Sequence, residues 1–179
     1  MNLFANIDKK AFVSVYDQTE SDGNFHVCRY LGEDDIFGLF QTVSTRGYDD
    51  GYYLVLLDYI YRVDIDDEYT ERIKKLFELQ RQPYYDCQFE DEKSLLVNLL
   101  SFSKQNNYVI SIFLEDGENI TGHINCIDPD DEVVKVDKLT EDGDVDGVSL
   151  VALDLIEKVI CNSGVERCIE MLAENKWYL

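Results

Sequence analysis

The chain has 179 residues, 45% of them hydrophobic, which is enough for one large or two small folded domains and excludes disorder throughout. Asp and Glu number 37 against 16 Lys and Arg, so the formal net charge is −21. A field of this sign repels phosphate backbones and anionic membranes, which argues against nucleic acid and membranes as partners, and it speeds encounter with a basic protein.

The negative charge is spread along the whole chain. Residues 1 to 90 hold 18 acids and 9 bases, a charge of −9, and residues 91 to 179 hold 19 acids and 7 bases, a charge of −12. Two interpretations stay open at this point. The acids either recognise a basic partner or only keep the protein in solution.

The lack of a recognisable signal peptide or membrane span and the cysteine usage favour a cytoplasmic protein. Residues 1 to 15 contain no apolar run long enough for a signal peptide, and no stretch approaches the roughly 18 apolar residues of a membrane span. The cysteines form an odd set without a C-x-x-C pair, as expected in a reducing compartment. They are Cys28, Cys87, Cys126, Cys161 and Cys168.

The first predicted helix covers residues 67 to 80, because apolar residues recur there at helical spacing. Its apolar face consists of Tyr69, Ile73, Leu76 and Phe77. The helix closes the first predicted domain, residues 1 to 82.

A connector is predicted at residues 83 to 92. It holds two tyrosines and a phenylalanine and lacks Gly and Ser, so we expect it to be ordered. The second predicted domain, residues 93 to 179, begins with a helix that Ser94 caps.

Five short strands follow in this second domain. They are rich in β-branched residues and are separated by turn signals such as Asp116-Gly117 and by a polar loop at residues 140 to 147. The predicted strands are residues 108 to 114, 119 to 127, 132 to 137, 148 to 153 and 155 to 160. Asn162 or Ser163 then caps a final helix that runs to residue 175.

The chain repeats itself at an offset of 96 residues. Between residues 34 and 78 this register gives 14 identities, where composition alone gives about three. The identical positions in the first copy are Asp34, Asp35, Gly47, Asp50, Gly51, Leu54, Val55, Leu57, Asp58, Ile60, Val63, Ile73, Leu76 and Glu78. The sequence therefore predicts two copies of one mainly β module.

The second copy resembles the first motif of Sm-like proteins. The motif residues are Leu114, Asp116, Gly117, Ile120, Gly122, Ile124, Ile127 and Asp128. The resemblance covers residues 93 to 160 and, more weakly, residues 11 to 65, and whole chains of this kind look similar to uncharacterised proteins of Gram-positive bacteria. It implies a mainly β fold with helices (α+β): two tandem Sm-like or SH3-like five-stranded barrels, each followed by a helix.

The residues by which Sm-like proteins hold RNA are missing at the matching positions. Such proteins carry an Asn soon after the motif Asp and an Arg-Gly pair between the last two strands. Here Pro129 and Asp130 follow Asp128, and the last corner holds Asp154, matched by Asp58 in the first copy. The resemblance therefore favours the fold and argues against RNA binding.

A calcium loop is a second candidate site. Asp142, Asp144 and Asp146 alternate and precede Gly147, as in the first six positions of such a loop. Position twelve, which should be a bidentate Glu, is Leu153. An acidic hairpin loop is the competing interpretation of these three metal-site candidates.

A tyrosine-rich acidic loop is the third candidate. Tyr48, Asp49, Asp50 and Tyr52 combine aromatic anchors with carboxylates, and Asp144 and Asp146 take part in the matching loop of the second copy. These six residues are predicted to bind a partner. The alternative is that the tyrosines pack inside the fold.

No catalytic site, nucleotide loop or cofactor motif is recognisable in the sequence. We therefore expect no enzyme and no cofactor, and the preferred hypothesis is an acidic protein-binding module, in one form a neutralising or immunity-type protein for a basic toxin. The alternatives are an Sm-like RNA-binding or regulatory protein and a purely structural protein that self-associates through barrel edges.

Overall fold

A computed structural model describes residues 3–19, 24–86, 89, 93–128 and 130–175. The chain divides into two compact units, Met1–Gln88 and Phe89–Leu179. Residues 87, 88 and 90–92 of the predicted connector lie outside the described residues. Within the described ranges, no helix is long and apolar enough to cross a membrane.

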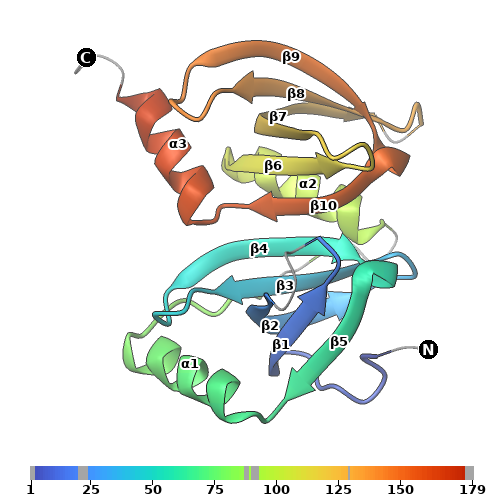
Figure 1. Cartoon of the computed structure of the whole chain (residues 1–179). Coiled ribbons are helices and arrows are strands. Elements are labelled where there is room, and N and C mark those ends of the chain that lie inside the picture. Colours follow the sequence, from blue (N-terminus) through green and yellow to red (C-terminus); the bar gives the residue numbers. More distant parts are fainter. Residues whose placement is uncertain (1–2, 20–23, 87–88, 90–92, 129, 176–179) are drawn as a thin grey trace. The chain divides into compact units, whose positions relative to one another are not determined.

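The described residues of the first unit form five antiparallel strands and one helix, and the strands pair in the order β5-β1-β2-β3-β4 (Figure 1). The elements are β1 (Phe12–Asp17), β2 (His26–Glu33), β3 (Phe37–Val43), β4 (Asp49–Leu56), the 3-10 turn η1 (Leu57–Tyr59), β5 (Ile60–Ile65) and α1 (Glu68–Leu79).

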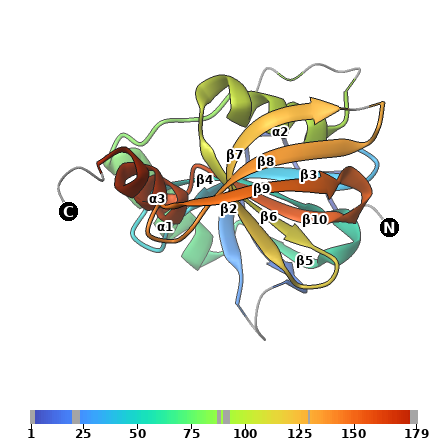
Figure 2. The ribbon, with the colours of Figure 1, turned by 90° about the horizontal axis from the view of Figure 1, so that it is seen from above.

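The second unit begins with a helix, and its strands pair in the order β10-β6-β7-β8-β9. The elements are α2 (Leu95–Asn106), β6 (Val109–Leu114), β7 (Asn119–Asp128), β8 (Val133–Leu139), β9 (Val145–Ala152), η2 (Leu153–Leu155), β10 (Ile156–Cys161) and α3 (Gly164–Glu174). Strands β7 to β10 fan out when seen from above, as strands of a strongly twisted sheet do (Figure 2).

The prediction of two tandem five-stranded barrels, each followed by a helix, is wrong. The strands form an open antiparallel sheet: among the described residues, β5 does not pair with β4, nor β10 with β9. Helix α2 precedes β6, as the sequence predicts for the start of the second domain. In each unit a three-residue 3-10 turn separates the fourth strand from the fifth. The fifth strand pairs with the first strand and not with the fourth, so the sheet stays open. Short strands with Gly turns occur in barrels and in open sheets alike.

The coarser prediction of a β-rich chain with helices is confirmed, and so are the helix starts. Asp67 caps α1 by accepting hydrogen bonds from two backbone N–H groups, Ser94 caps α2, and Ser163 caps α3. The one strand that differs clearly is β9. It begins at Val145, inside the predicted polar loop.

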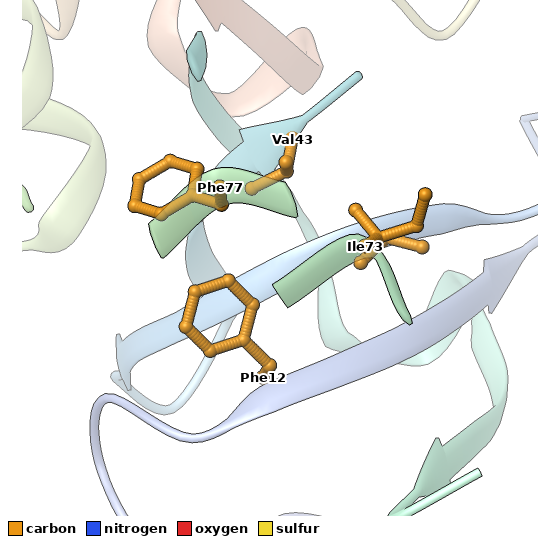
Figure 3. Packing of buried hydrophobic residues seen from close by; sticks show 5 residues of the cluster. Phe12, Val43, Ile73 and Phe77 are labelled. Carbon is orange, nitrogen blue, oxygen red and sulfur yellow. The ribbon is translucent and has the colours of Figure 1, made fainter. Parts of the chain in front are cut away.

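Helix α1 covers one face of the first unit's sheet (Figure 3). Ile73 and Phe77 of the helix pack with Phe12, Val27 and Val43 of the strands, and all five are buried. The predicted apolar face of this helix is confirmed, since Tyr69 and Leu76 also pack against the cluster.

Candidate functional site

Four residues line up across the strands of the first unit, each paired with the next. We name Phe12, Arg29, Gln41 and Tyr52 the first row. Directly paired residues point to the same face of a sheet, here the face that α1 covers. All four are buried, although Arg29 and Gln41 are polar and need hydrogen-bond partners.

Residues 82–86 supply these partners. This segment is neither helix nor strand, and its backbone lies over the first row. Gln41 donates from Nε2 to the carbonyl oxygen of Pro83 (2.8 Å) and accepts at Oε1 from the N–H of Tyr85 (3.1 Å). Arg29 donates from Nη1 to the carbonyl oxygen of Tyr85 (2.7 Å). The first row therefore binds the backbone of a non-helical peptide segment.

Side chains of the segment add contacts at both ends. The ring of Tyr85 stacks on Tyr52 with centroids 4.5 Å apart, and its hydroxyl donates to Oδ2 of Asp49 (2.5 Å). Asp86 forms an ion pair with Lys10 (2.8 Å). The hydrogen bond from Lys10 holds the pKa of Asp86 below its usual value. Two predicted partner-binding residues, Asp49 and Tyr52, are thus engaged by the chain's own segment.

The other predicted residues of the first unit lie differently. Tyr48 is 51% exposed and directly precedes β4, while Asp50 lies on β4 and not in a loop. The preceding turn is short because Gly47 adopts a left-handed φ of +79° and its N–H donates to the carbonyl oxygen of Ser44 (2.8 Å). The structure therefore leaves Tyr48 accessible and buries Asp49 and Tyr52.

The second unit aligns four residues in the same way. We name Val109, His123, Asp137 and Val148 the second row. In contrast to Tyr52 of the first row, Val148 is 54% exposed. On the same strand, Val145 is 81% and Leu150 is 73% exposed. The outer strand β9 thus presents three apolar side chains to solvent.

The three predicted calcium ligands lie at the start of this strand, since Asp142 and Asp144 precede β9 and Asp146 lies on it. The hydroxyl of Thr140 accepts from the N–H of Asp144 (3.0 Å), and Oδ2 of Asp146 accepts from Nζ of Lys138 (3.0 Å). Asp142 is exposed at the turn. Among the described residues, which include these three acids, no group of three or more His, Cys, Asp or Glu side chains is placed to hold a metal ion.

Two pockets lie within the first unit. One of about 560 Å³ is lined by four carboxylates and four apolar residues. Its lining consists of Leu3, Phe4, Glu33, Asp34, Asp35, Leu57, Asp58 and Ile60. The other, of about 550 Å³, includes Phe25, His26, Asp50 and Tyr69. The first pocket brings together Asp34, Asp35 and Asp58, three of the repeated acids, and its charge disfavours anionic ligands.

The sequence did not single out Gln41, Arg29 or Asp137. Each is a polar residue within a predominantly apolar strand, and this is the signal that could have drawn attention to them. Their alignment depends on the register of strand pairing, and β-bulges in β2 and β7 shift that register. Strand pairing gives His123 the same place in its row as Arg29, whereas the offset of 96 residues matches His123 to Val27.

No family model, no curated protein and no solved structure matches this chain. The resemblance to Sm-like proteins therefore stays a prediction from the motif. Any function must be argued from the charges and contacts of the chain itself.

Proposed function

We propose that this chain is a non-catalytic protein-binding module, built by internal duplication, whose acidic surface recognises a basic protein. The observation that carries the proposal is the exposed side of β9. There Val145, Val148 and Leu150 are exposed beside Asp144 and Asp146. Apolar side chains surrounded by charged ones are typical of protein interaction sites, and an acidic rim selects a basic partner.

Two further observations support this choice over the alternatives. The pocket that Glu33, Asp34, Asp35 and Asp58 line places four carboxylates together, which disfavours a phosphate backbone and hence an RNA-binding function. Four cysteines of the described part are free thiols, which supports a cytoplasmic location. A neutralising protein for a basic toxin is one concrete form of the proposal, and the net charge of −21 motivates it.

Affinity capture from the native host lysate tests the proposal. We expect the immobilised chain to retain a protein of high isoelectric point in about 50 mM salt, before and after nuclease treatment. Raising the salt to about 500 mM should release it, because screening weakens charge recognition.

Matched variants sharpen the test. Asp144→Asn with Asp146→Asn should weaken binding of the purified partner about tenfold or more, while Glu115→Gln with Asp116→Asn, an equal charge change in another turn, should have a smaller effect. Capture of RNA in place of protein, or of no protein at all, contradicts the proposal.

A further inference from the structure

We propose that the second row and the exposed apolar residues of β9 bind a basic, non-helical segment of the partner, in the way that the first row binds residues 82–86. The inference rests on the proposed function, since it names the part of the partner that is recognised. It assigns the contact to one face of the second unit, formed by β7, β8 and β9.

The first unit shows what this type of face binds. In the register of 96 residues, Gln41 corresponds to Asp137 and Tyr52 to Val148. The strand pairings agree, because Gln41 pairs with Tyr52 and Asp137 pairs with Val148. The site on the first unit is occupied by the chain's own backbone, through Gln41.

The β9 end of the corresponding face on the second unit is exposed, beside the half-buried Asp137. Tyr52 is 5% exposed beneath Tyr85, whereas Val148 is 54% exposed. Leu150, two residues further along β9, and Val145, paired with Leu139, extend the same surface. Because β9 is last in the strand order, one side of its backbone also has no neighbouring strand within the described residues. Such an edge accepts an added peptide strand.

The residue exchange at the centre of the row defines the chemistry of the ligand. The Gln41 amide both donates and accepts, so it binds a carbonyl and an N–H of a neutral backbone. An ionised Asp137 only accepts; its Oδ2 takes one hydrogen bond, from Nδ2 of Asn125 (2.9 Å), and a carboxylate has capacity for several more. Asp137 therefore selects N–H groups and the cationic heads of Lys or Arg.

The surrounding negative charge also favours a basic segment. Residues 91 to 179 carry −12, from 19 acids and 7 bases, and Lys138 beside the row is already paired with Asp146. A segment with apolar or aromatic side chains over Val148 and Leu150, and with basic side chains near Asp137, fits both the shape and the charge of the face.

Two labelled peptides of equal length test the inference: Gly-Gln-Pro-Tyr-Tyr-Lys-Lys and Gly-Gln-Pro-Tyr-Tyr-Glu-Glu. We expect the basic peptide to bind the full chain at least tenfold more tightly in low salt. Its addition should shift the backbone amide signals of β8 and β9, around Asp137, Val148 and Leu150, more than those of any other element.

Substitutions separate this site from general attraction to an acidic protein. Val148→Lys should weaken the basic peptide at least tenfold, whereas Met171→Lys, the same charge change at an exposed apolar residue of α3, should weaken it less than twofold. Val148→Ser, which leaves the charge unchanged, should weaken it severalfold. Asp137→Gln with Val148→Tyr copies the first row and should reduce the preference for the basic peptide. Melting curves confirm that each variant is folded.

The outcomes distinguish the two proposals. Equal losses for Val148→Lys and Met171→Lys, or amide shifts outside β7, β8 and β9, overturn the inference and leave the proposed function standing. If neither the basic peptide nor any basic protein binds in low salt, the proposed function fails and the inference fails with it.

Discussion

At the scale of single residues, a buried polar contact joins the last helix of each unit to its first strand. The contact consists of a strand serine, a residue in the first helical turn and the residue that caps the helix. These residues are Ser14, Thr70 and Asp67 in the first unit and Ser111, Glu166 and Ser163 in the second. In the first unit the cap carries the carboxylate and the helix residue the hydroxyl, and in the second unit the cap carries the hydroxyl and the helix residue the carboxylate. Both arrangements give the buried strand serine a hydrogen-bond partner.

Asp67→Ala should lower the free energy of unfolding by about 1 kcal/mol, and by up to about 2 kcal/mol, because the first N–H groups of α1 lose their acceptor. Burial raises the pKa of Asp67, but the hydrogen bonds from Thr70 and Tyr69 outweigh it and lower the pKa overall. The stabilisation is therefore present above the unfolded pKa of about 3.9 and is lost as the pH falls through the lower folded value.

Urea unfolding at pH 7 and at successively lower pH measures this difference. Asp58→Ala, which removes an exposed acid, is the control and should change the stability by less than about 0.5 kcal/mol. A deficit for Asp67→Ala that grows toward low pH contradicts the assignment.

Tyr53→Phe should lower the free energy of unfolding by about 1 to 3 kcal/mol. The hydroxyl of Tyr53 donates to Oδ2 of Asp17 (2.7 Å), and Asp17 is 2% exposed, so removal of the donor leaves a buried carboxylate with one partner fewer. Burial raises the pKa of the Tyr53 hydroxyl, which keeps it a donor. Thermal unfolding provides the measurement, with the exposed Tyr61→Phe as control; equal losses in both variants would refute this role.

At the scale of elements, local signals predicted the helices and the strands of the second unit. Apolar spacing locates α1, the capping residues Ser94 and Ser163 locate α2 and α3, and β-branched runs locate strands such as Val109–Leu114. Sheet closure was not predictable, since the same strands fit a barrel or an open sheet. The candidate site was only partly predictable: Asp49 and Tyr52 were among the six residues predicted to bind a partner, but their burial depends on Tyr85, 33 residues further along the chain than Tyr52.

Gly47, in the turn before β4, lies close to Leu76 of α1. Gly47→Ala should cost about 2 to 5 kcal/mol, because left-handed backbone strain of about 1 to 2 kcal/mol adds to an overpacking cost of about 1 to 3 kcal/mol. A Cβ at Gly47 would lie 2.4 Å from Cβ of Leu76.

Gly117→Ala is the matched control for this prediction. Gly117 has a similar φ of +83°, and a Cβ there would meet no atom within 4 Å. It should therefore show the backbone strain alone. Denaturant unfolding of both variants isolates the packing cost against the helix, and equal losses would mean that this close approach contributes nothing.

At the scale of the whole molecule, charge dominates. A net charge of −21 on 179 residues means that acids far outnumber the cations that could neutralise them. The ion pairs among the described residues are mostly exposed, as between Lys10 and Asp86. Exposed pairs contribute little to stability, whereas like charges repel one another throughout the folded chain. The acidity that favours a basic partner should therefore destabilise the protein when the partner is absent.

Added salt should stabilise this protein at pH 7. Raising NaCl from about 20 mM to about 500 mM shortens the Debye length from roughly 20 Å to about 4 Å, which screens repulsion between exposed carboxylates more than it weakens the few surface ion pairs. We expect the melting temperature to rise by several degrees. Near the isoelectric point of about 4.2 the net charge vanishes, so the same addition should have little effect there. A melting temperature that falls with salt at pH 7 would show that attractive pairs outweigh the repulsion, and the excess of acids would then have to be balanced locally on the surface.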